Sequence, residues 1–194
     1  MNSRPPSMNN EGNAGTYKAP PYAGGSHNVT HTDVGALSML SRLGCKTLLD
    51  VGCGVGGQVK AAERAGFKAF GIDVDPVVLG PSNIALIDLC KAPVVFPEQF
   101  DVVWSVEVAE HIPPEYAGNY LDTVCNNAKR ILVMTASQEK IPGHVNIKPP
   151  GWWMHRAEMR AMQFSPELTA MLRRFSTMTR DFMEKTGMVF VRMV

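Results

Sequence analysis

The sequence of 194 residues contains no C-x-x-C pair, because its four cysteines, Cys45, Cys53, Cys90 and Cys125, are scattered. Their spacing predicts neither a zinc site nor a disulfide framework, and we expect no metal. The sequence also lacks an excess of charge of either sign, since it has nineteen basic and eighteen acidic side chains and a formal net charge of +1. This balance argues weakly against a general affinity for nucleic acid.

Long apolar runs are missing as well. No segment approaches the roughly 20 apolar residues of a membrane-spanning helix, and the polar N-terminus lacks the charged start and apolar centre of a signal peptide. We therefore expect a cytoplasmic protein without membrane contact. Its hydrophobic content of 45% is that of an ordinary globular chain and leaves room for one domain with a sizeable core.

Residues 1–30 contain no Leu, Ile or Phe, but they are rich in Pro, Gly and Asn. Such a segment cannot bury enough apolar surface to offset the entropy of ordering, which predicts a flexible tail. The alternative is a lid that folds over a bound ligand, with Tyr22 against the substrate. Residues 31–194 are then expected to form a single domain.

Helices and strands are predicted to alternate through most of that domain. Thr32 or Asp33 caps a first helix that ends near Leu43, where Gly44 allows a left-handed stop. Helical spacing recurs at 58–65 and 114–130, and short apolar runs typical of strands occupy 46–51, 68–72, 84–89, 100–105 and 131–135. This order predicts an α/β fold, Rossmann-like and doubly wound, with a mostly parallel sheet and helices on both faces.

The C-terminal part departs from this alternation. Ser165 followed by Pro166 is a strong helix start, and apolar residues then recur at helical spacing as far as Phe182, which predicts one long helix against the sheet. After Gly187, residues 188–194 are expected to form an antiparallel strand at the edge of the sheet.

A glycine-rich turn follows the first strand of the domain, with Asp50, Gly52, Gly54 and Gly56 in a D-x-G-x-G-x-G pattern. Glycines let a ligand approach the backbone, and the helix that follows offers free N–H donors. Asp73 ends the next strand about 20 residues later, where a carboxylate meets the ribose hydroxyls of a nucleotide. A pyrophosphate would be repelled by Asp50, whereas a cationic cofactor would be attracted, so the turn favours S-adenosylmethionine over NAD.

These motifs resemble those of class I S-adenosylmethionine-dependent methyltransferases, in particular the small bacterial and phage members of the type 11/23-like group. The resemblance covers roughly residues 32–135. It implies that the second motif places Asp73 on the ribose and Val74 against the adenine. It further implies that the cofactor is bound by the residues at the ends of the third and fourth strands, namely Asp88 and Leu89 at the adenine and Ser105 and Val106 beside the methionine part.

The acceptor is expected to meet the loop after the fifth strand, which contains a Gly-His-Val-Asn sequence and then a Trp pair. His144 is the candidate general base and His111 a second catalytic candidate, because imidazole titrates near neutrality. Asn146 and Trp152 are candidate substrate contacts. The alternatives are that His144 and Asn146 hold the loop's own backbone, and that one of the two tryptophans belongs to the core.

The sequence thus predicts a methyltransferase that acts on a hydroxyl of a small molecule or glycan. RNA, DNA or protein acceptors stay open, although the residues after the fourth strand differ from those of DNA amino-methyltransferases. An NAD-dependent oxidoreductase is a further alternative, but Asp50 would repel the pyrophosphate of NAD. A catalytically inactive cofactor-binding partner protein is the non-enzymatic alternative, and the sequence does not indicate the oligomeric state.

Overall fold

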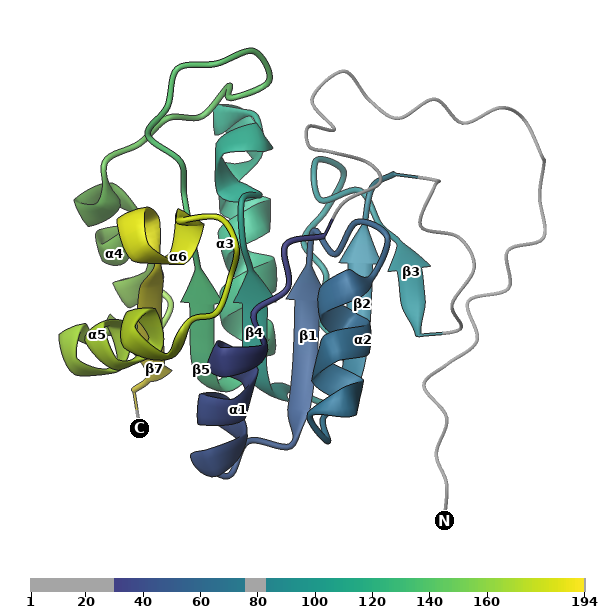
Figure 1. The fold of residues 1–194 in the computed structure, drawn as a ribbon. Helices are drawn as coiled ribbons and strands as arrows, with labels where there is room; N and C mark the ends of the chain where they lie inside the picture. Colours follow the sequence, from purple (N-terminus) through teal and green to yellow (C-terminus); the bar gives the residue numbers. More distant parts are fainter. Residues whose placement is uncertain (1–29, 76–82, 194) are drawn as a thin grey trace, which may run out of the picture.

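The structure, a computed structural model, describes residues 30–75 and 83–193. Within them a seven-stranded sheet has the spatial order β3-β2-β1-β4-β5-β7-β6 (Figure 1). Its strands are β1 (Thr47–Val51), β2 (Lys68–Asp73), β3 (Ile84–Leu86), β4 (Phe100–Ser105), β5 (Ala128–Met134), β6 (Met162–Phe164) and β7 (Met188–Arg192). All neighbouring pairs from β3 to β5 are parallel, and β7 is antiparallel to both of its neighbours. The predicted fold class is therefore confirmed.

Helices cover both faces of the sheet. One face carries α1 (Val34–Arg42), α2 (Gly57–Arg64), α5 (Pro166–Phe175) and α6 (Phe182–Thr186), and the other carries α3 (Ala117–Asn127) and α4 (Pro150–Glu158) (Figure 1). Adjacent strand residues enter opposite cores: Leu48 packs on the α1 face and Leu49 on the α3 face. This alternation explains why the central strands read as nearly continuous apolar runs. Among the described residues, no helix is long and apolar enough to cross a membrane.

Helix α1 begins as the sequence predicts. Asp33 is its N-cap and accepts a hydrogen bond from the Ala36 N–H, and Gly44 after its end has a φ of 81°. Helix α3 is shorter than the predicted span of 114–130, because a 3₁₀ turn occupies Pro114–Tyr116 and β5 begins directly at Ala128. The Arg192 guanidinium donates to the carbonyls of Cys125 and Ala128, which stabilises this abrupt change from helix to strand.

The prediction of one long helix after Ser165 is wrong. Helix α5 ends at Phe175, and α6 begins only at Phe182. The chain leaves the helix because Ser176 Oγ and the Thr177 N–H both donate to the carboxylate of Asp33 at the start of α1. A contact between residues 143 apart in sequence thus outweighs the local apolar spacing.

The last strand has the predicted antiparallel direction but not the predicted position. Strand β7 lies between β5 and β6, so β6 forms this edge of the sheet. The three residues of β6 are too few to be recognised from their pattern. They are fixed by the hydrogen bonds of β7 and by the Arg192 guanidinium, which donates to the Arg160 carbonyl just before β6.

The Asp33 junction generates a stability prediction. We expect Asp33→Ala to lower the free energy of unfolding by about 2 to 3 kcal/mol, because a fully buried carboxylate loses its helix cap and its bonds to Ser176 and Thr177. Urea denaturation measures the change. Asp181→Ala is the matched control, because Asp181 is the N-cap of α6 without a capping side-chain bond, and it should change stability by less than about 1 kcal/mol. Equal effects of the two substitutions would contradict the assignment.

Candidate active site

A cleft of about 1070 Å³ opens at the carboxyl ends of the parallel strands. Chain order turns back between β1 and β4, and crevices at such a switch point are the usual ligand sites of open α/β sheets. The cleft contains most of the residues predicted for the cofactor. Those that line it are Asp50, Gly52, Gly54, Asp73, Val74, Asp88, Leu89 and Val106.

The glycine turn after β1 needs its three glycines for different reasons. Gly52, Gly54 and Gly56 have φ values of 78°, 51° and 78°, a region that other residues rarely adopt. A Cβ on Gly52 would lie 2.2 Å from Val108 Cγ2, and one on Gly56 would lie 2.4 Å from Ile84 Cδ1. At Gly54 no described atom lies within 4 Å of such a Cβ, so this is the position where a ligand can approach the backbone. Gly56 is the N-cap of α2 and does not line the cleft.

Asp73 is held rigidly at the end of β2. Its Oδ2 accepts from the Gly54 N–H at 2.8 Å, and its Oδ1 accepts from the Asp75 N–H at 2.9 Å. The same carboxylate therefore orders the glycine turn and faces the cleft. Asp88 is fixed in a similar way, because its Oδ1 accepts from the Cys90 N–H at 2.9 Å.

Asp50 lies at the bottom of the cleft with only 3% of its surface exposed. Burial, and then the negative charge of Asp73, raises the pKa of Asp50 to about 8. The carboxylate form is thus costly in the free protein and would be favoured by a cation bound next to it.

Ser105 does not reach the cleft, contrary to the sequence prediction. It is fully buried, and its Oγ accepts a hydrogen bond from the Tyr120 hydroxyl at 3.0 Å. The residue ends β4 with its side chain toward α3, whereas the next residue, Val106, faces the cleft. Because side chains alternate along extended backbone, the side chain of only one of these neighbours faces the cleft.

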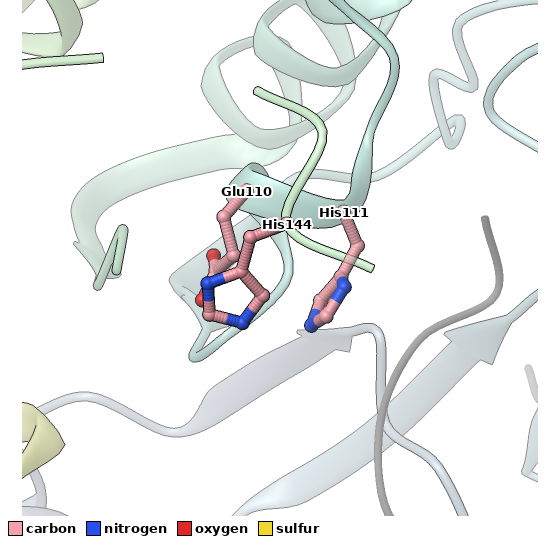
Figure 2. A group of neighbouring side chains, drawn as sticks. All are labelled: Glu110, His111 and His144. Carbon is pink, nitrogen blue, oxygen red and sulfur yellow. The ribbon is translucent and has the colours of Figure 1, made fainter. Parts of the chain in front are cut away.

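His111 and His144 line the same cleft, although they come from different loops. His111 ends a 3₁₀ turn (Ala109–His111), and its Nδ1 lies 2.9 Å from the Gly143 carbonyl. His144 Nδ1 lies 2.8 Å from the Glu139 carbonyl. The two rings are edge-to-face with centroids 4.9 Å apart (Figure 2). Burial lowers the pKa of His111, which favours its neutral form.

Two acids beside these histidines were not identified as site residues from the sequence. Glu107 lines the cleft and has a φ of 57°, and its Oε1 accepts from the Thr135 hydroxyl at 2.8 Å. Glu110 is fully buried, and burial together with the charge of Glu107 raises its pKa to about 8. The Glu-x-x-Glu-His spacing could have indicated this cluster, because a single tight turn brings residues i and i+3 close to each other.

The Glu110 backbone also positions the acceptor loop. Its carbonyl accepts from the N–H groups of Val145 and Asn146 at 2.9 and 3.0 Å, which places His144 beside His111. Asn146 itself is 1% exposed and does not line the cleft.

Trp152 does not line the cleft either. It lies on α4 against Trp153, with ring centroids 4.7 Å apart and the Arg156 guanidinium over its ring. Trp153 is the tryptophan that belongs to the core. Tyr22 lies outside the described residues.

Comparisons with known proteins agree with this geometry. Residues 49–134 match a family model described as a methyltransferase domain. The chain is 29% identical over 121 residues to a probable chloroplastic tocopherol O-methyltransferase of Oryza sativa subsp. japonica, covering 54% of this chain and 33% of the relative. It is 40% identical over 78 residues to the 2-methyl-6-phytyl-1,4-hydroquinone methyltransferase of Synechocystis, covering 34% of this chain and 24% of the relative. The matched segments thus span a third or less of these relatives.

The fold also matches the crystal structure of magnesium protoporphyrin IX methyltransferase from Synechocystis PCC 6803 with bound S-adenosylhomocysteine. The TM-score is 0.57 at 17% identity, and the match covers 81% of this chain and 80% of that one. Residues 49–134 therefore match a methyltransferase domain, and the fold is that of methyltransferases crystallised with S-adenosylmethionine or S-adenosylhomocysteine. Both findings support the predicted family and its cofactor, S-adenosylmethionine.

The Asp73 geometry predicts a loss of cofactor affinity. We expect Asp73→Ala to weaken binding of S-adenosylhomocysteine by about 10- to 150-fold, because charge-assisted hydrogen bonds worth about 1.5 to 3 kcal/mol are removed. Isothermal titration calorimetry measures it. Asp101→Ala is the control, because Asp101 also accepts from backbone N–H groups, those of Lys46 and Thr47, but lies at the opposite end of the sheet. Unchanged affinity in the Asp73 variant would remove this residue from the site.

The raised pKa of Asp50 predicts a pH dependence. The free protein holds this carboxyl protonated below about pH 8, and a cofactor ammonium next to it favours the carboxylate. Binding should therefore release a proton at pH 7, and affinity should rise between pH 6 and 8. Calorimetry in two buffers of different ionisation enthalpy counts the protons. Asp50→Asn should abolish the release, and an unchanged count would contradict the assignment.

Proposed function

We propose that this chain transfers the methyl group of S-adenosylmethionine to a hydroxyl of a small molecule or glycan. The observation that carries the proposal is the pair of histidines in the cleft that also contains Asp50, Gly54 and Asp73. The residues predicted to bind the cofactor lie after β1 and β2. His111 and His144 lie after β4 and β5, at what we call the acceptor end of the cleft. A donor and an acceptor bound to these two parts would meet above the β1–β4 switch point.

The reaction is an in-line displacement. The hydroxyl oxygen attacks the methyl carbon, the bond from sulfur to carbon breaks, and S-adenosylhomocysteine leaves while the hydroxyl proton passes to a base. Alignment of donor and acceptor supplies most of the rate, and the base contributes a further factor. Hence a hydroxyl acceptor needs a proton-accepting group close to the methyl carbon.

In the chain without a bound metal ion, His144 is the best candidate for the general base. A carbonyl oxygen only accepts, so the Nδ1 next to the Glu139 carbonyl carries the ring proton and Nε2 keeps a free lone pair. His111 has the same tautomer for the same reason. Both rings are thus oriented by backbone carbonyls, as a general base must be.

Small acceptors also fit the names of the relatives, which specify tocopherol and a phytyl hydroquinone. A hydroquinone carries phenolic hydroxyl groups, whose deprotonation activates the oxygen and the aromatic ring carbons. We propose the hydroxyl oxygen as the atom that receives the methyl group. Incubation of the purified chain with S-adenosylmethionine and panels of phenols, sugars, amines, RNA and protein, read out as S-adenosylhomocysteine formation, tests the acceptor class. NMR of the product distinguishes O-, C- and N-methylation.

A panel without turnover, combined with tight cofactor binding, would favour the alternative of an inactive cofactor-binding partner protein. Turnover on RNA or protein alone would replace the small-molecule proposal.

Once an acceptor is known, His144→Ala should lower turnover by about 100-fold or more and leave the affinity for S-adenosylhomocysteine unchanged. The loss reflects a missing proton acceptor, since the cofactor residues are untouched. His155→Ala is the control, because this exposed histidine of α4 does not line the cleft. Equal turnover of the His144 variant and the wild type would make the loop histidine structural.

A further inference from the structure

Three potential metal ligands converge beside the cleft. One carboxylate oxygen of Glu110 and one ring nitrogen each of His111 and His144 lie within 4.8 Å of one another. Figure 2 shows the Glu110 carboxylate against the His144 ring, with His111 on the other side of that ring. The three side chains come from two segments, the turn after β4 and the loop after β5, which only the fold brings together.

The histidine tautomers suit metal binding. In both rings Nδ1–H donates to a backbone carbonyl, that of Gly143 for His111 and that of Glu139 for His144. In its neutral form each ring therefore keeps Nε2 unprotonated and available to a metal ion. Metal-binding histidines typically make this second hydrogen bond, which fixes the ring orientation and raises the basicity of the ligand nitrogen.

Glu110 supplies an independent observation. It is fully buried, and neither of its carboxylate oxygens has a hydrogen bond of ordinary geometry among the described residues, although the Glu107 carboxyl and the Ser137 backbone lie near it. A buried carboxylate without an ion-pair partner is costly, so a cation bound at this position would stabilise it. The ion pairs of lysine and arginine in the described part of the chain do not include Glu110.

We propose that Glu110, His111 and His144 bind one divalent first-row transition-metal ion at the acceptor end of the cleft. Two imidazoles and a carboxylate form the facial donor set that leaves coordination positions open. Metal bonds of about 2.0 to 2.2 Å place neighbouring donors about 3 to 3.6 Å apart, so binding draws these donor atoms, now within 4.8 Å of one another, closer together. The cysteine spacing does not indicate this site, because it uses no thiolate. Imidazole donors favour zinc, cobalt, iron or nickel over magnesium.

The role of the ion rests on the proposed function. A bound divalent ion that takes the acceptor oxygen as a further ligand orients it and lowers the pKa of its hydroxyl. In the metal-loaded chain the hydroxyl proton leaves to water in the open cleft as the oxygen attacks the methyl carbon, and His144 acts there as a ligand. In the metal-free chain His144 is the base described above. Metal binding itself does not depend on which acceptor is used.

The test uses the untagged full chain after treatment with a chelator. Zn²⁺ is titrated by calorimetry, and Co²⁺ is titrated in parallel by visible absorption. We expect one site per chain and a cobalt spectrum of nitrogen and oxygen ligands. His144→Ala and Glu110→Gln should each weaken binding by about 100-fold or more, since loss of an outer partner alone typically costs 10- to 100-fold. His155→Ala is the matched control and should bind like the wild type.

S-adenosylhomocysteine affinity is measured on every sample and reports whether each variant is folded. Variants that bind this ligand normally but bind metal weakly support the site. Wild-type metal affinity in both variants, no metal binding by the wild type, or a cobalt–thiolate band that places the ion on a cysteine would overturn it. Metal binding without cofactor binding would contradict the proposed function but not this site. Cofactor binding without metal binding would contradict this site but not the proposed function.

Discussion

The close approach of Gly52 to Val108 is the contact on which both halves of the site depend. Because Gly52 has no side chain, the turn after β1 can lie against the segment after β4. Val108 then leads into the 3₁₀ turn that contains Glu110 and His111. The Glu110 carbonyl in turn holds the loop that carries His144. The absence of a Cβ at Gly52 thus allows the glycine turn to pack against the segment that leads to the acceptor end of the cleft.

The elements predictable from the sequence are those whose local pattern and packing agree. Strand β4 has the predicted bounds, and α1 has its predicted cap and stop, because apolar runs and capping residues act over a few positions. The helix after Ser165 was predicted too long because its break depends on Asp33, far away in the sequence. Local spacing carries no information on such a contact.

The candidate site divides in the same way. Motif spacing correctly brought Asp50, Gly54 and Asp73 to one cleft, since consecutive parallel strands end at one edge of the sheet. Ser105 could not be separated from Val106 by the motif alone, because the choice depends on the Tyr120 hydroxyl behind the strand. Glu110 was missed because its burial and its lack of an ion-pair partner depend on the fold, and neither can be read from the local sequence.

The cleft contains two buried acids whose negative forms are disfavoured in the protein alone. Burial raises the pKa of Asp50 below the glycine turn and that of Glu110 at the acceptor end to about 8 each. Purely structural acids tend to be paired or exposed, so two such groups in one site indicate that the missing charges come from ligands. S-adenosylmethionine, with its ammonium and sulfonium, is a cation suited to the first. A divalent metal ion suits the second, since it brings charge together with open positions for a hydroxyl oxygen. The electrostatic argument supports the cofactor at Asp50, whereas the metal site rests on geometry, namely the convergence of Glu110, His111 and His144 within 4.8 Å.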